Sequence, residues 1–71
     1  MRELKHTNIE ECAKGTLLHY KSGTPAGILI NKAYSELKGY KGHPYWFWML
    51  GILTTDGIYF DIELGEYDLF F

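Results

Sequence analysis

The fold of this chain is decided by residues 45–64, YWFWMLGILTTDGIYFDIEL. In the second half of this stretch, one set of alternate positions is apolar and the other is more polar: Ile58, Phe60, Ile62 and Leu64 against Tyr59, Asp61 and Glu63. Alternation with a period of two is typical of a half-buried β-strand. The preceding Asp56-Gly57 pair accepts the positive φ angles that a tight hairpin turn needs. The stretch therefore predicts two antiparallel strands, at 45–54 and 58–64.

The strand at 45–54 is apolar on both faces, so one of its two rows must lie outside the core that the following strand defines. The turn decides which row this is. A two-residue loop at Asp56-Gly57 pairs Leu53 with Phe60, whereas a three-residue loop at 55–57 reverses the assignment by one residue. The first register gives these candidate partner-binding residues on the outward face: Trp46, Trp48, Leu50, Ile52, Tyr59, Asp61 and Glu63.

Three kinds of cover fit such an outward apolar row. The first is a segment of this chain, either an N-terminal helix or a loop at 35–44 that includes Tyr40. The second is a protein partner or another copy of the chain, because Trp and Tyr dominate binding hot spots. The third is a small ligand or stacked nucleic-acid bases, against which the neighbouring Asp61 and Glu63 argue. In the second case these two carboxylates form the polar rim of the interface.

Three further strands are expected on either side of the decisive stretch. Residues 16–21 (TLLHYK) and 26–34 read as strands joined by a turn at 22–25, SGTP, because small residues, glycine and proline favour turns. Residues 35–44, SELKGYKGHP, contain two glycines and a proline and predict a loop. The last strand is expected at 67–71. An alternative for this segment is a detached peptide ending in Leu-Phe, similar to those that insert into bacterial sliding clamps.

A short helix is expected before the strands. Thr7 and Glu10 have the spacing of a capping box, in which Thr7 caps the helix and Glu10 follows three residues later. Gly15 then predicts the end of the helix. Two turns of helix are not stable alone, so this one must dock on the sheet through Ile9, Cys12 and Ala13.

These elements predict one domain over residues 1–71, with a helical lead at 1–14 and a five-stranded antiparallel barrel at 15–71. The arrangement of GTLL at 15–18, PAGILI at 25–30, ILTTDGI at 52–58 and YDL at 67–69 resembles small SH3-like barrels, including many from bacteriophages. The resemblance implies a mostly β, SH3-like fold and a phage origin. It implies no activity, because small barrels support unrelated functions.

Charge is divided unevenly along the chain. All seven basic residues lie between Arg2 and Lys41, with four acids, whereas residues 42–71 contain five acids and neither Lys nor Arg. The C-terminal half therefore cannot contribute to a continuous basic surface for phosphates, which argues against nucleic acid as a partner. The single cysteine, Cys12, cannot form an internal disulfide, which favours the cytoplasm. No apolar run approaches the roughly 20 residues of a membrane-spanning helix, so no membrane segment is expected.

No catalytic or metal-binding motif stands out. His6, His19, His43 and Cys12 are too far apart in sequence for a structural zinc motif, and no cofactor is expected. Asp61 and Glu63 share a strand face, but a solvated face accounts for them without catalysis. The sequence therefore predicts a non-enzymatic protein-interaction module: a phage accessory protein that binds a host or virion protein, or self-associates, through its aromatic strand. The alternative is a protein that sequesters a small ligand or nucleotide.

Overall fold

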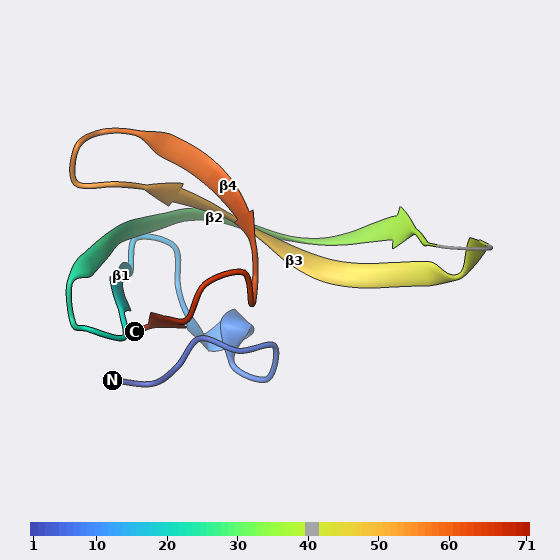
Figure 1. Ribbon diagram of the computed structural model, residues 1–71, viewed down its shortest axis with the longest axis horizontal. Coiled ribbons are helices and arrows are strands. Elements are labelled where there is room, and N and C mark those ends of the chain that lie inside the picture. The colour runs from blue at the N-terminus through green and yellow to red at the C-terminus, as the bar shows by residue number, and fades with distance from the viewer. Residues whose placement is uncertain (40–41) are drawn as a thin grey trace.

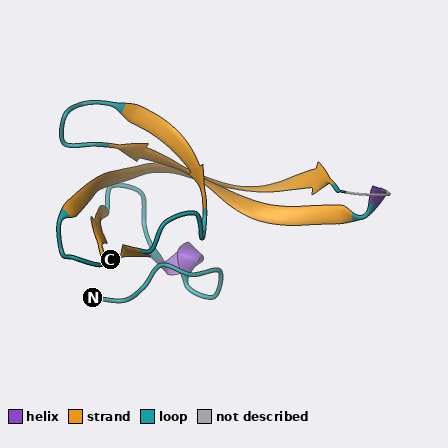
Figure 2. Ribbon diagram, in the orientation of Figure 1, coloured by secondary structure: helices purple, strands orange, loops and turns teal. Residues whose placement is uncertain are grey.

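The computed structural model describes residues 1–39 and 42–71 and is mostly β, as expected (Figures 1 and 2). Its five strands form one antiparallel sheet with the order β4-β3-β2-β1-β5. The strands are β1 (Leu17–Tyr20), β2 (Pro25–Lys38), β3 (Pro44–Leu53), β4 (Tyr59–Glu63) and β5 (Leu69–Phe70). Within the described ranges, no helix is long and apolar enough to cross a membrane.

The expected barrel closure is not present. Within the described residues the two outer strands of the sheet, β4 and β5, do not pair with each other, so the sheet stays open. β5 pairs with β1 through His19↔Phe70 and Tyr20↔Leu69, and the side chain of Leu69 is buried. The C-terminal residues therefore form a strand of the sheet, and the alternative of a detached peptide is wrong.

The predicted loop at 35–44 is also wrong at five of its ten residues, 35–38 and 44, which lie in strands. β2 continues to Lys38 and β3 begins at Pro44, in a continuous register from Ala33↔Met49 to Lys38↔Pro44. Composition suggested a loop here because glycine and proline cluster at the tip. Cross-strand packing prevails instead, since aromatic pairs across two strands stabilise a ladder. Proline is tolerated as the first residue of β3. Tyr40 and Lys41, at the tip, lie outside the described residues.

The expected N-terminal helix is a single 3₁₀ turn, η1 (Ile9–Glu11). Thr7 does not cap it. The N-cap position is held by Asn8, whose side chain folds backwards instead: its Oδ1 accepts the Lys5 N–H at 2.8 Å and its Nδ2 donates to the Glu3 carbonyl at 2.9 Å. This local side-chain bonding competes with helix formation, which explains why the capping box fails.

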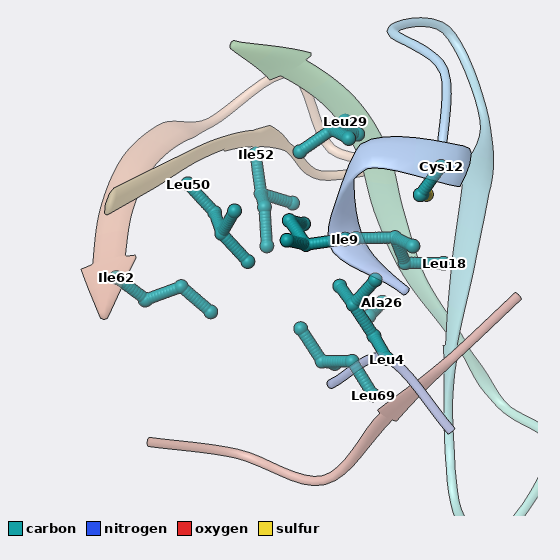
Figure 3. Close-up of a cluster of buried hydrophobic side chains, with 10 residues drawn as sticks. All are labelled: Leu4, Ile9, Cys12, Leu18, Ala26, Leu29, Leu50, Ile52, Ile62 and Leu69. Carbon is teal, nitrogen blue, oxygen red and sulfur yellow. The ribbon is translucent and has the colours of Figure 1, made fainter. Parts of the chain in front are cut away.

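The short turn nevertheless covers the core. Ile9 and Cys12 are fully buried, as predicted, whereas Ala13 is exposed. Figure 3 shows Ile9 beside Ile52 of β3, with Cys12 further from Leu50 and Ile52 in the same cluster. The complete buried cluster is Leu4, Ile9, Cys12, Leu18, Ala26, Leu29, Leu50, Ile52, Ile62 and Leu69.

Lys32 of β2 fastens this cover to the sheet. Its Nζ donates to three backbone carbonyls of the covering segment, those of Ile9 (3.1 Å), Glu10 (3.2 Å) and Cys12 (2.9 Å). An ammonium group has three N–H donors, so these three bonds satisfy it completely. The charge also stabilises the carbonyl end of η1, where partial negative charge collects.

The β3–β4 hairpin has the three-residue loop. The Thr54 N–H donates to the Ile58 carbonyl at 2.8 Å, and the register runs Leu53↔Tyr59, Ile52↔Phe60 and Leu50↔Ile62. The row that contains Leu50 and Ile52 therefore faces the core together with Phe60 and Ile62. The opposite row, which contains Phe47, Met49 and Leu53, lies on the other face of the sheet.

The turn predicts the first test of this structure. Gly57 has φ = +83°, and a Cβ placed there meets nothing within 4 Å, so strain at this position comes from the backbone alone. We expect Gly57→Val to lower the free energy of unfolding by about 1–2 kcal/mol, because β-branched residues avoid positive φ. Gly57→Asn, the matched control, should cost less because Asn tolerates this region. Urea denaturation measures both, and equal losses would show that the turn is misplaced.

Candidate functional site

The β2–β3 hairpin extends past the rest of the sheet (Figure 1). β4 pairs with β3 only over Met49–Leu53, and β1 pairs with β2 only over Pro25–Ile28. Residues 33–38 of β2 and 44–48 of β3 therefore form a two-stranded projection, which we call the aromatic arm. The molecule measures 40 Å along its longest axis against 24 and 20 Å along the others.

One face of the arm continues the core-facing side of the sheet, and we call it the inner face. Tyr34 stacks on Trp46, with 5.3 Å between ring centroids and 12° between planes, and contacts Trp48 at 5.0 Å. His6, from the N-terminal segment, meets the edge of Tyr34 at 5.8 Å. Trp48 also packs against the buried cluster, whereas Tyr34 and Trp46 remain 48% and 49% exposed. The aromatic cluster thus begins at the core and ends in solvent.

The opposite, outer face is also apolar. Tyr45 and Phe47 stack with 5.6 Å between centroids, and Leu37, which pairs with Tyr45 across the strands, is 59% exposed. Further along this face the ring of Tyr59 lies over Gly51, and a Cβ at Gly51 would collide with that ring. Glycine in a strand leaves backbone uncovered, and a neighbouring aromatic ring can cover it. The Tyr59 ring therefore covers the backbone of Gly51, and it can do so only because residue 51 has no side chain.

Two tyrosine hydroxyls on the outer face bind the nearby carboxylates. Tyr45 Oη donates to Glu63 Oε1 at 2.5 Å, and Tyr59 Oη donates to Asp61 Oδ1 at 3.0 Å. The hydrogen bond to Glu63 raises the pKa of Tyr45 above its ordinary value, and the bond to Asp61 does the same for the pKa of Tyr59. Losing the phenolic proton would both break the bond and place two negative charges together.

The candidate partner-binding residues divide into three groups. Leu50 and Ile52 are 0% and 1% exposed, so their assignment to the outward face is wrong. The three-residue loop shifts the pairing of β3 with β4 by one residue. This is the second of the two registers that the sequence allowed, and it turns Leu50 and Ile52 towards the core. Trp46 and Trp48 do project to the same side, since both contact Tyr34, but that side is the inner face. The remaining three residues, Tyr59, Asp61 and Glu63, lie on the outer face.

Sequence reasoning missed four exposed or half-exposed arm residues: Tyr34, Leu37, Tyr45 and Phe47. The first register placed Phe47 in the core row. Tyr45 and Tyr34 were expected only as the first and last residues of strands, and Leu37 was expected in the loop at 35–44. Leu37 gave no strand signal, because residues 34–38 (YSELK) do not alternate between apolar and polar. The glycines after Lys38 then favoured a loop.

A cleft of about 320 Å³ lies at the base of the arm. Four consecutive residues of β3, Tyr45–Trp48, line one wall. Successive strand residues point to opposite faces, so a cleft that touches all four lies along the edge of the strand. The other walls are the N-terminal segment 3–6 and the connection 63–65 and 67–68 between β4 and β5.

The cleft carries more negative than positive charge. Its carboxylates are those of Glu3, Glu63 and Asp68, against the single ammonium of Lys5 and the side chain of His6. Lys5 pairs with Glu3, at 3.9 Å between Nζ and Oε1. Within residues 1–39 and 42–71, excluding the Lys38 side chain, neither Glu63 nor Asp68 has a Lys or Arg within salt-bridge distance. This reflects the sequence, whose last 30 residues contain no Lys or Arg.

The remaining candidate ligands lie apart from one another. His6 lines the cleft, His19 lies on β1 opposite Phe70, and His43 lies at the tip of the arm. In the part of the chain that the structure describes, no three His, Cys, Asp or Glu side chains form a group that could hold a metal ion. Burial raises the pKa of the Cys12 thiol, which keeps it in its unreactive, protonated form.

Comparison of this chain with protein-family models, with curated proteins and with solved structures gives no match. The aromatic arm and its cleft are therefore interpreted from their own geometry and charge.

The hydroxyl–carboxylate pairs predict a shift in tyrosine titration. In the parent, Tyr45 should ionise at a higher pH than a free tyrosine because Glu63 holds its proton. Glu63→Gln removes the negative charge, so the pKa of Tyr45 should fall towards its ordinary value. Ionisation is followed by the ultraviolet absorbance of tyrosinate during an alkaline titration. Subtracting the titration of Tyr45→Phe, made both in the parent and in Glu63→Gln, isolates the contribution of Tyr45. An unchanged pKa in Glu63→Gln would contradict the contact.

Proposed function

We propose that this chain is a non-enzymatic protein-interaction module that contacts its partner through the aromatic arm. The observation that carries the proposal is the arm itself: a regular hairpin that leaves the body of the sheet and exposes large aromatic and apolar side chains on both faces. Tyr34, Leu37, Tyr45 and Trp46 are each about half exposed or more. Exposed apolar patches of this kind mark interaction sites.

The energetics favour such a role. Burying Trp and Tyr at an interface contributes most of the binding energy in many complexes. The stacking of Tyr34 on Trp46 already fixes both rings, so little side-chain freedom remains to be lost on binding. A two-stranded ribbon without further strands is only marginally stable in water, and a partner would supply the contacts that β1 and β4 supply to the body.

Two partner types belong to this proposal: another protein or a second copy of this chain. The resemblance of residues 15–71 to SH3-like barrels of bacteriophages adds a setting, in which a phage accessory protein acts on a host or virion protein in the host cytoplasm. Sequestration of a nucleotide has less support, because the carboxylates of Glu3, Glu63 and Asp68 in the cleft repel phosphate.

Trp46→Lys tests the arm, and Ile58→Lys is its matched control. Both residues are exposed, but Ile58 (61%) lies next to the β3–β4 turn, away from the arm. We expect Trp46→Lys to weaken association by about 2 kcal/mol or more, as for an interface hot spot. Ile58→Lys should leave association unchanged, and both variants should keep the fold by circular dichroism.

Association is measured by sedimentation velocity for copies of the chain and by affinity capture from extracts of the source cells for other proteins. If a complex seen with the parent is lost in Trp46→Lys and kept in Ile58→Lys, the result supports the arm as the binding surface. A parent protein that is monomeric and captures nothing, or a Trp46→Lys variant that keeps its partner, contradicts the proposal.

A further inference from the structure

We infer that the cleft beside the arm binds an extended, basic peptide segment, which adds as a strand to the open edge of β3. This inference rests on the proposed function and deepens it, because it names the part of the arm that is used and the chemistry of the partner.

The edge of β3 is open where the cleft lies. β4 follows β3 as far as Met49↔Glu63, and the Leu64 N–H then donates to the Trp48 carbonyl at 2.9 Å. Beyond this bond the chain turns away, with the Glu66 N–H donating to the Glu63 carbonyl at 3.0 Å. Among the described residues, no strand pairs with Pro44–Phe47 on the side away from β2. The position that β4 would occupy is therefore free there.

The direction of the backbone groups follows from the ladder. In an antiparallel sheet, alternate residues direct their N–H and C=O groups to the two neighbouring strands. Trp48 and Thr54 direct theirs towards β4, as their bonds to Leu64 and Ile58 show. Trp46 has the same parity, so its N–H and C=O point into the cleft. An antiparallel peptide strand placed there exchanges both hydrogen bonds with Trp46, which is the strand-addition mode of peptide recognition.

Length and side-chain alternation define the peptide. The open edge spans Pro44–Phe47, which corresponds to an extended segment of about 13–17 Å, or four to five residues. The residue opposite Trp46 places its side chain on the same, inner face, beside the exposed indole of Trp46. Residues next to it in the peptide point to the outer face, towards Tyr45 and Phe47.

Charge selects a basic segment. The cleft contains three carboxylates and one lysine, and that lysine already pairs with Glu3. A Lys or Arg side chain opposite Trp46 meets the indole, which attracts cations through its ring face, and the carboxylate of Asp68 lines the same cleft. An acidic peptide meets uncompensated carboxylates instead.

The test uses the full chain and four five-residue probes. The first probe is acetyl-Lys-Val-Lys-Val-Lys-amide, and the second has Glu in place of Lys. We expect the first to change the tryptophan fluorescence in a saturable way and the second to bind at least tenfold more weakly. The third probe is the lysine peptide N-methylated at its lysine amides, which removes the N–H groups that face Trp46. It should not bind, whereas methylation at the valine amides should leave binding unchanged.

Variants of the protein locate the site. Asp68 makes no hydrogen bond or ion pair in the structure's described part, so Asp68→Asn removes charge from the cleft without removing a contact. We expect it to weaken the lysine peptide by about two- to fivefold, as for an exposed charge pair. Asp56→Asn is the control, because it makes the same chemical change in a turn where Asn-Gly is as well tolerated as Asp-Gly. It should leave the affinity unchanged.

The outcomes separate this inference from the proposed function. Equal binding of the acidic and basic peptides, or equal binding of the two N-methylated forms, overturns strand addition by a basic segment. So does a parent protein that sediments as a dimer with the Trp46 amide protected, because a second copy then fills the edge. In either case, the proposed function stands if Trp46→Lys still abolishes association, and falls together with the inference if it does not.

Discussion

The Lys32 ammonium binds three carbonyls of the N-terminal segment, and the rest of the structure depends on this contact. The segment has little regular structure of its own, since η1 is a single turn. Its fixed position comes from burial of Leu4, Ile9 and Cys12, from the backbone hydrogen bonds of residues 2–4 to residues 69–71, and from the bonds of Lys32 to Ile9, Glu10 and Cys12. A single ammonium satisfies three carbonyls at once, and those of Ile9 and Cys12 are partly buried, where a donor is worth more than in water. With this cover in place, the face of the sheet that contains Leu50 and Ile52 becomes the core.

The same cover explains why the arm is exposed. A segment of this length covers only the part of the sheet around Leu29, Leu50 and Ile52. On the arm, His6 of this segment meets the edge of Tyr34. Further out, β2 and β3 pair with each other, and cross-strand aromatic stacking, together with the hydrogen bond from Tyr45 to Glu63, takes over from core burial as the stabilising interaction. One chain therefore contains a packed body and an arm whose apolar surface it does not cover itself.

The sequence predicts the Asp56-Gly57 hairpin and the alternation of β4, because each depends on neighbouring residues, and it predicts five antiparallel strands but not that the sheet stays open. It leaves the register open because the rows of Leu50 and Met49 are both apolar, and only the N-terminal cover distinguishes them. It misplaces residues 35–38 because the stacking of Tyr34 on Trp46 is a contact between distant residues. Lys32 was beyond sequence reasoning for the same reason, since its three acceptors lie 20 to 23 positions away. That one apolar row of β3 lies outside the core did follow from the sequence, because β3 is apolar at both sets of alternate positions.

The most direct test of this account is the rate at which a thiol reagent modifies Cys12 under native conditions. Cys12 is the only cysteine, and its side chain is fully buried within the segment that Lys32 holds. Lys32→Met keeps an unbranched apolar stem but removes the donors, so the segment should open more often and the rate should rise about tenfold, which corresponds to a loss of about 1.4 kcal/mol. Lys14→Met, at an exposed position of the same segment, should leave the rate unchanged. Equal rates in the two variants would contradict the central place of the Lys32 contact.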